Sequence, residues 1–88
     1  MLIAIDYDNT YTADPEWWDE VIRSGQRRGH TIVCVTGRTE PPKLPIRVIC
    51  AGDEYKRDAV RRSGLRIDVW IDDEPGHIEP GRKLDWSA

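Results

Sequence analysis

The sequence has no long hydrophobic run, only two cysteines and no excess of positive charge. Its first apolar run is too short for a secretory signal or a membrane span, and no later segment approaches the length that a bilayer requires. Cys34 and Cys50 each lie within an apolar run, which favours buried thiols over a disulfide framework or a zinc site. From these absences we expect a cytoplasmic protein without membrane contact.

The composition is typical of a globular chain. With 88 residues, 39% apolar and 33% charged, we expect a single domain over 1–88, with no internal repeat or linker. The net charge of −3 excludes a uniformly basic nucleic-acid-binding protein, although ten of the thirteen cationic residues are arginine and can cluster. A tail at 76–88 follows a core at 2–75, and it either folds over the body or stays loose. Its apolar residues are Ile78, Leu84 and Trp86.

Four apolar runs of strand length alternate with signals for helices. The run at 31–35 is continuous and β-branched, as in a parallel strand that is buried on both faces. Further strands are expected at 2–5, 46–50 and 67–71. This alternation predicts a small three-layer, Rossmann-like α/β sandwich with a mostly parallel sheet of about four strands.

A first helix is marked clearly at both ends. Asp14 is a typical N-cap, Pro15 suits the first helical position, and cations followed by a glycine end the helix near Arg28. Apolar residues recur at helical spacing, so one face should pack on the sheet. Trp17 and Trp18 lie on this helix, and we expect at least one of them in the core rather than on a stacking platform for a base or sugar.

The second helix and the loop before the third strand are less sharply marked. Asp53 is expected to cap the helix, with Glu54 in its first turn and a stop at Gly64. The proline-rich stretch 38–45 is too short for a usual parallel crossover. Either an extended loop crosses the sheet edge there, or the third strand lies elsewhere.

Polar residues follow three of the predicted strands at the point where each ends. They are Asp6 and Asp8, Thr36 and Gly37, and Asp72 and Asp73. Because parallel strands end at one edge, we expect four carboxylates around a cation site, with a hydroxyl and a glycine N–H beside it as phosphate ligands. Two carboxylates about 4 Å apart repel by roughly 4 kcal/mol, so the cluster needs a cation, a shared proton or open water. Mg²⁺ prefers such oxygen ligands, and Lys56 would add a positive charge.

In the order and spacing of these motifs, the chain resembles the haloacid dehalogenase (HAD-like) superfamily of hydrolases. The family's D-x-D-x-T motif after an apolar strand matches Ile3–Thr10, and its strand ending in Ser or Thr matches Val35–Arg38. A lysine upstream of the last strand fits Lys56, and a strand that ends in an acidic pair fits Val69–Asp73. The match runs from Leu2 to Pro75, and it implies a HAD-like core as the fold.

The resemblance implies a role for each residue of the site. Asp6 would be the nucleophile that forms an aspartyl phosphate, and Asp8 would protonate the leaving oxygen and later activate water. Lys56 would neutralise charge that Asp6 shares with the phosphate. The phosphoryl oxygens would be held by Thr10, Thr36 and the Gly37 amide. Mg²⁺ would bind Asp6 and the Asp8 carbonyl. Its third ligand would be Asp73 rather than Asp72, because the family's ligand tends to sit just past the strand.

The spacing also implies that the site has no cap. The short stretches after Thr10 and between Thr36 and Lys56 leave no room for the cap domain that encloses small substrates in many relatives. An open site suits a phosphate on a nucleotide, a nucleic-acid end or a protein, or on a small metabolite enclosed by a neighbouring subunit of a homo-oligomer. Asn9 stands where the family often has glycine, although asparagine tolerates unusual backbone angles.

Three functions are therefore compared. The first is a Mg²⁺-dependent phosphomonoester hydrolase. The second is a phosphoacceptor receiver domain, but its acceptor lies on a central strand and its lysine on the last one, whereas here the D-x-D motif opens the chain. The third is a catalytically inactive HAD-like binding or scaffold domain. The complete set of Asp6, Asp8, Lys56 and Asp73 favours the hydrolase.

Overall fold

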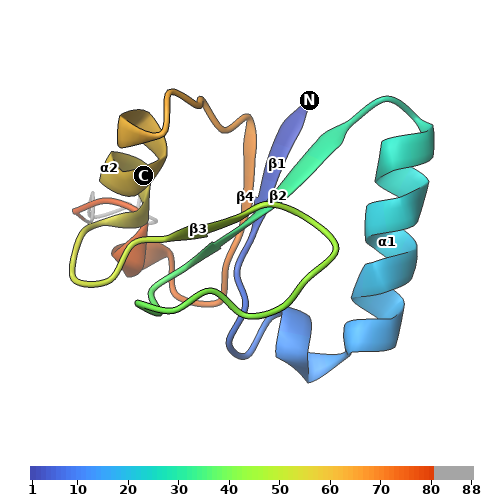
Figure 1. The fold of residues 1–88 in the computed structure, drawn as a ribbon, viewed down its shortest axis with the longest axis horizontal. Helices are drawn as coiled ribbons and strands as arrows, with labels where there is room; N and C mark the ends of the chain where they lie inside the picture. The colour runs from blue at the N-terminus through green and yellow to red at the C-terminus, as the bar shows by residue number, and fades with distance from the viewer. Residues whose placement is uncertain (81–88) are drawn as a thin grey trace, which may run out of the picture.

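Four parallel strands form one sheet at the centre of the molecule. The computed structural model describes residues 1–80. The strands lie in the order β3-β2-β1-β4 (Figure 1). Their bounds are β1 Leu2–Ile5, β2 Thr31–Thr36, β3 Val48–Cys50 and β4 Val69–Ile71. The predicted Rossmann-like α/β fold with about four mostly parallel strands is confirmed.

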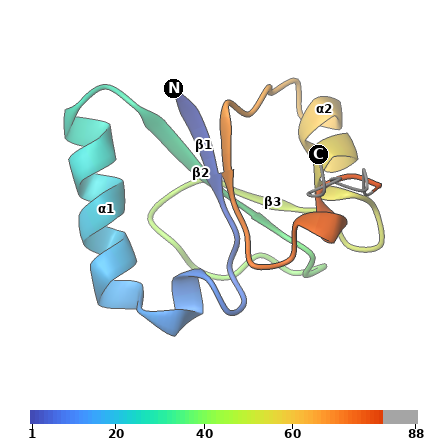
Figure 2. The ribbon, with the colours of Figure 1, turned by 180° about the vertical axis from the view of Figure 1, so that it is seen from behind.

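Two helices cover opposite faces of this sheet. Successive strand residues point to opposite faces, so each strand contributes to two separate apolar clusters. Ala4, Val33 and Val35 pack with helix α2 (Lys56–Arg62), whereas Ile5 and Cys34 pack on the side of helix α1 (Pro15–Arg27). Figures 1 and 2 show α1 and α2 on opposite sides of the strands. The result is the three-layer arrangement that the sequence predicts.

Helix α1 begins and ends where the sequence predicts. The Asp14 carboxylate accepts a hydrogen bond from the Trp17 amide at 3.3 Å, and Pro15 is the first helical residue. Trp18 is partly buried and packs against the α1-side cluster, as expected for one of the pair, while Trp17 is 53% exposed. The helix approaches β2 closely at Gly25, where an added Cβ would lie only 2.7 Å from the Ile32 side chain.

The predicted start of the second helix at Asp53 is wrong. Gly52 adopts a left-handed conformation with φ of 57°, and the Glu54 amide bonds to the Ala51 carbonyl, so these residues form a turn. Tyr55 remains extended as the N-cap residue. Lys56 is therefore the first residue of α2. Because side chains lean toward the N-terminus of their helix, this position directs Lys56 to the edge where the strands end.

Two strands are shorter than predicted. β3 begins at Val48 rather than at residue 46, because the chain bends just before it and Ile46 packs against the α1-side cluster. β4 begins at Val69 rather than at residue 67. There the Asp68 carboxylate accepts the Leu2 amide at 2.7 Å, so a side chain replaces a carbonyl of the ladder.

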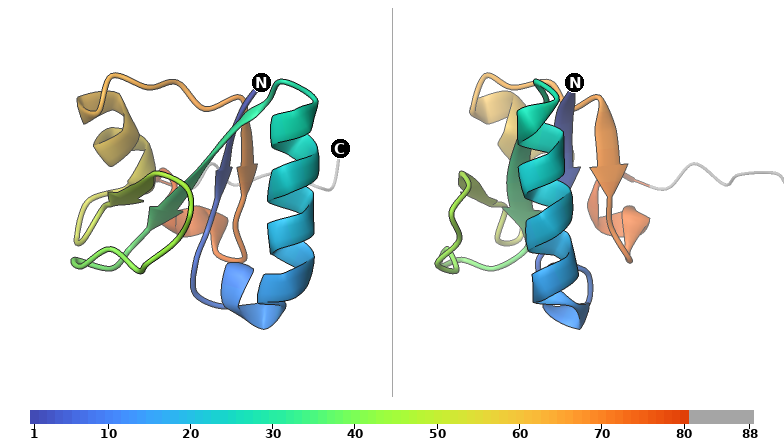
Figure 3. Two further views of the ribbon diagram at one scale, coloured as in Figure 1. Left: turned by 45° about the vertical axis from the view of Figure 1, so that its right-hand side comes forward. Right: turned by 90° about the vertical axis from the view of Figure 1, so that its right-hand side faces the viewer.

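The connection from β2 to β3 is an extended loop. β3 is parallel to β2, and no helix lies between them, so the first of the two alternatives for this stretch is the correct one (Figure 3). Leu44 and Ile46 of the loop pack on the α1-side cluster. The loop thus covers part of that face, as a crossover helix would in a longer chain.

The chain after β4 folds back onto α2. A short 3₁₀ helix, η2 (Pro75–His77), leads to Ile78, which is buried and whose carbonyl accepts the Arg57 amide at 2.9 Å. Of the two alternatives for the tail, the first holds at Ile78, whereas Leu84 and Trp86 lie outside the described residues. Cys34 is fully buried and Cys50 partly buried, and both thiols are free. Within residues 1–80, no helix has the length and apolar character needed to cross a membrane.

Candidate active site

The acidic residues meet where the chain places β1 beside β4. β1 lies between β2 and β4, and the chain reaches β2 through α1 on one face of the sheet and β4 through α2 on the other. Such a switch point opens a crevice at the carboxyl ends of the strands. Asp6 follows β1, and its amide bonds to the Ile71 carbonyl of β4 at 2.9 Å. This pairing brings Asp6 level with Asp72 and Asp73.

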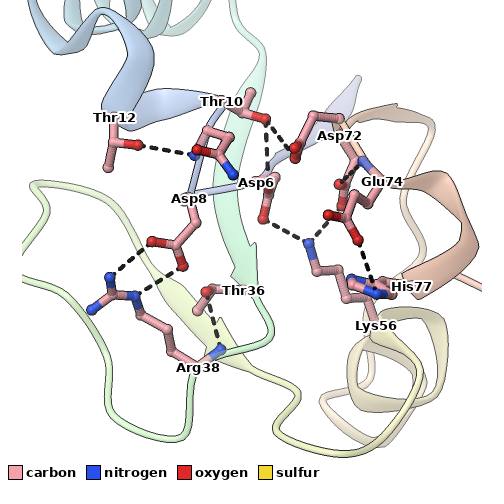
Figure 4. Close-up of polar contacts among 12 residues, drawn as sticks. Asp6, Asp8, Thr10, Thr12, Thr36, Arg38, Lys56, Asp72, Glu74 and His77 are labelled. Carbon is pink, nitrogen blue, oxygen red and sulfur yellow. Dashed lines mark hydrogen bonds and ion pairs between the residues drawn. The ribbon is translucent and has the colours of Figure 1, made fainter.

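Lys56 joins two of these carboxylates. Its Nζ lies 2.7 Å from Asp6 Oδ1 and 2.6 Å from Asp72 Oδ2 (Figure 4). The three side chains are each less than a tenth exposed. The second oxygen of Asp72 accepts the Glu74 amide at 2.9 Å, so both of its oxygens are occupied within the protein.

Thr10 connects the two ends of the acidic cluster. Its Oγ lies 3.3 Å from Asp6 Oδ2 and 3.4 Å from Asp73 Oδ1, so one hydroxyl proton is shared between two carboxylates. A tight turn brings Thr10 there, because Asn9 has φ of 61° and the amide of Tyr11, which opens the 3₁₀ helix η1 (Tyr11–Ala13), bonds to the Asp6 carbonyl. The hydroxyl faces carboxylates, and its predicted contact with phosphate stays a prediction.

Three carboxylates can share one cation. Asp6, Asp72 and Asp73 each offer an oxygen, and these oxygens lie within 4.8 Å of one another. The Asp6 and Asp72 side chains are buried, whereas Asp73 is exposed, so the group opens from the interior toward solvent. Three carboxylates and the Lys56 ammonium sum to a charge of −2, which a divalent cation would neutralise. Carboxylate oxygens are hard donors, and the set fits Mg²⁺.

The pKa shifts follow from this excess of negative charge. Burial raises the pKa of the Asp6 carboxyl above its ordinary value, Lys56 offsets part of that, and the nearby Asp73 raises it again. Burial acts to lower the pKa of Lys56, but the hydrogen bonds to Asp6 and Asp72 outweigh it and raise that pKa. One ammonium is thus shared among more carboxylates than it can neutralise.

The Asp8 carboxylate lies outside the cluster, so the expectation of four carboxylates around one cation is wrong. Both of its oxygens accept from Arg38, at 2.9 Å from Nε and 2.8 Å from Nη2. These hydrogen bonds lower the pKa of Asp8 below its ordinary value. The Arg38 guanidinium lies 5.0 Å from the centre of the Tyr7 ring. Figure 4 shows the Asp6 and Asp8 carboxylates directed to different cations.

The end of β2 borders the same site. Thr36 is fully buried, and its Oγ accepts the Arg38 amide at 3.2 Å. Gly37 is exposed, and a Cβ at its position would meet no atom within 4 Å. A hollow of about 390 Å³ lies beside these residues, and Gly37, Tyr55, Lys56 and His77 are among those lining it. The strand therefore ends beside open space next to Lys56.

Two pairings at the site escape sequence reasoning. From its position next to Thr36-Gly37, the sequence favours a surface role for Arg38 over contact with a substrate phosphate, and it gives no sign of the pairing with Asp8. His77 offers no partner in the sequence, whereas in the structure its Nε2 lies 3.0 Å from the Glu74 carboxylate. Comparison of the chain with models of protein families, with curated proteins and with solved structures finds no match.

Proposed function

We propose that this protein is a Mg²⁺-dependent phosphomonoester hydrolase of the HAD-like type that works through an aspartyl phosphate. The observation that supports it most is the position of Lys56 between Asp6 and Asp72 at the end of β1 and β4. A nucleophilic carboxylate that must approach a phosphate dianion needs a fixed positive charge beside it. Burial of this pair makes the ammonium more effective than it would be in water.

The proposed reaction has two displacements. An Asp6 oxygen forms a bond to phosphorus while the ester P–O bond breaks, and the leaving oxygen takes a proton from Asp8. Water then attacks the phosphorus, Asp8 takes a proton from that water, and Asp6 is released with inorganic phosphate. Lys56 keeps the Asp6 carboxylate oriented in both steps. Thr36 and the Gly37 amide are the groups proposed to contact the phosphoryl oxygens.

Asp73 suits the role of metal ligand better than Asp72 does. Both oxygens of Asp72 already accept hydrogen bonds, from Lys56 and from the Glu74 amide. Asp73 is exposed, and within residues 1–80 its carboxylate accepts one hydrogen bond, the long one from Thr10. Asp6, Asp73 and the Asp8 carbonyl would hold Mg²⁺, which when bound would offset the negative charge of the carboxylates and the phosphate.

The substrate class follows from the openness of the site. Among residues 1–80, the connections around the site are short turns and one extended loop, and none forms a cap domain. The hollow beside Lys56 is of a size that accommodates part of a small ligand. We therefore propose a phosphate that projects from a nucleotide, a nucleic-acid end, a protein or a small metabolite.

The test is hydrolysis of phosphomonoesters. The substrates are an aryl phosphate, nucleoside monophosphates and oligonucleotides with a 5′- or 3′-phosphate, each with and without Mg²⁺. The wild type should release phosphate only with Mg²⁺. Asp6→Asn should lower the rate by about a thousandfold or more, because the nucleophile is lost, whereas Glu20→Gln, at an exposed position on α1, should not change it.

Two results would contradict the proposal. Equal rates in wild type and Asp6→Asn would exclude Asp6 as nucleophile. A folded wild type that binds Mg²⁺ but hydrolyses none of these esters would favour the scaffold domain instead.

A further inference from the structure

Arg38 holds Asp8 in a position that does not suit the acid that the proposed reaction needs. The guanidinium binds both oxygens of the Asp8 carboxylate, and both side chains are about half exposed, 52% and 49%. Because both carboxylate oxygens are engaged by the guanidinium, Asp8 is held away from Asp6 and the acidic cluster. Asp8 must therefore leave Arg38 before it can act.

The bond between these residues is one that a phosphate can replace. Exposed ion pairs contribute little to stability, because water and salt compete with them. The planar fork of arginine binds phosphate in the same two-point manner as carboxylate, and a phosphate dianion carries more charge. A phosphate dianion near Asp8 would therefore compete effectively with the Asp8 carboxylate for the Arg38 guanidinium.

Arg38 is also anchored beside the proposed phosphate position. Its amide donates to Thr36 Oγ at the end of β2, while its side chain lies near the Tyr7 ring that precedes Asp8. Lys56 already donates to two carboxylates. Lys56 and Mg²⁺ together would only balance the three carboxylates, so an incoming phosphate dianion would still lack a cation, and Arg38 lies at this edge.

We propose that Arg38 exchanges partners when substrate binds: it leaves Asp8 for the phosphoryl group and so releases Asp8 for its acid–base role. This inference rests on the proposed function for the role of Asp8. The exchange makes Arg38 a phosphate-binding residue and couples phosphate binding to the availability of the acid. No covalent change is involved.

Binding of inorganic phosphate at saturating Mg²⁺, measured by calorimetry, tests the exchange without turnover. Arg38→Ala should weaken phosphate binding about tenfold, and Arg38→Lys should restore part of the loss. Asp8→Asn should strengthen binding by up to about fivefold, because the competing carboxylate has lost its charge. In the Arg38→Ala background, Asp8→Asn should have no such effect.

Arg62→Ala is the matched control. Arg62 forms an exposed ion pair with Glu54 at 2.8 Å, and Arg62 itself is the last residue of α2, whereas Lys56 is the first. The variant Arg62→Ala should leave phosphate affinity unchanged. If Arg38→Ala binds phosphate like Arg62→Ala, or if Asp8→Asn has the same effect with and without Arg38, the exchange is refuted. Absence of phosphate binding by the wild type would refute it as well.

The hydrolysis assay separates the two proposals. If the wild type hydrolyses an ester, but Asp8→Asn changes phosphate affinity equally with and without Arg38, the hydrolase proposal stands and the exchange is refuted. If the effect of Asp8→Asn on phosphate affinity depends on Arg38, but no ester is hydrolysed, Arg38 binds phosphate at this site and the hydrolase proposal is refuted.

Discussion

Lys56 Nζ lies 2.7 Å from Asp6 Oδ1, although 50 positions separate the two residues in the chain and both are buried. Asp6 leaves the end of β1, and Lys56 begins α2. A helix on one face of the sheet thus supplies the cation for a carboxylate at the edge of that sheet. The pair is the centre of the acidic cluster, and most of the following predictions depend on it.

Removal of the ammonium should destabilise the fold. Lys56→Met leaves Asp6 and Asp72 buried without their cation, which costs about 3–5 kcal/mol in the free energy of unfolding. Urea denaturation at neutral pH without Mg²⁺ measures this loss in the free energy of unfolding. The exposed Lys43→Met should change the free energy by less than about 0.5 kcal/mol. If the two variants were equally stable, the pair would not carry this energy.

Asp73 should matter only when Mg²⁺ is present. Without the ion, Asp73→Asn removes one of three crowded negative charges, so its melting temperature should equal or exceed that of the wild type. With Mg²⁺ at about a hundred times its dissociation constant, the wild type should gain about 2.7 kcal/mol, and the variant much less. Asp53→Asn should respond to Mg²⁺ like the wild type. A full response in Asp73→Asn would exclude Asp73 as a ligand.

The Thr10 hydroxyl should orient the acidic cluster for the ion. Thr10→Val keeps the shape of the side chain but loses the shared hydrogen bond to Asp6 and Asp73, at a cost of about 1 kcal/mol in stability. Mg²⁺ affinity, measured by calorimetry, should fall about tenfold, as is common when a group that supports metal ligands is removed. Thr10→Ser should bind Mg²⁺ nearly as well as the wild type, and so should the exposed Thr39→Val. Unchanged affinity in Thr10→Val would contradict this role.

Tyr11 should make the fold sensitive to alkaline pH. Its hydroxyl donates to Asp19 at 2.8 Å, and this hydrogen bond, together with burial, raises the pKa of Tyr11 to about 12. Since the unfolded tyrosine loses its proton near pH 10, the unfolded chain binds fewer protons between these values, and stability falls as pH rises. The contribution is complete below pH 10 and is lost by about pH 12.

The urea midpoint as a function of pH tests this dependence. Tyr11→Phe should show a smaller decline above pH 10 than the wild type. Burial also raises the pKa of the Cys34 thiol to about 12, but this contribution is common to both proteins and cancels in the comparison. Asp19→Asn should reduce the decline too, since the charge that raises the pKa of Tyr11 is removed. Parallel curves for Tyr11→Phe and wild type would contradict the prediction.

Local signals in the sequence predict the fold well where each signal acts over a few residues. Asp14 and Pro15 mark the start of α1 because capping and a preset φ act within a single turn. The signal at Asp53 fails for a tertiary reason. Gly52 turns the chain before the helix can begin, and the helix starts only where Lys56 can reach Asp6.

Strand ends were harder to predict than strand centres. Apolar β-branched residues mark each centre, but the last paired residue depends on the neighbouring strand. At β4, the Asp68 carboxylate accepts the hydrogen bond from the Leu2 amide that a backbone carbonyl would accept in a regular strand pair. No local pattern around residue 68 predicts this contact. The extended path of the loop before β3 likewise depends on the apolar cluster that Leu44 and Ile46 cover.

By itself, the sequence determined which residues reach the carboxyl edge of the sheet, because the end of an apolar run and the parallel order of strands require only local patterns. Asp6, Thr36 and Asp73 are placed in this way. Only the tertiary structure decided which carboxylate meets which cation. Lys56 goes to Asp6 and Arg38 to Asp8 because the turn at Asn9 and the late start of α2 set the directions of side chains that are 30 and 50 positions apart.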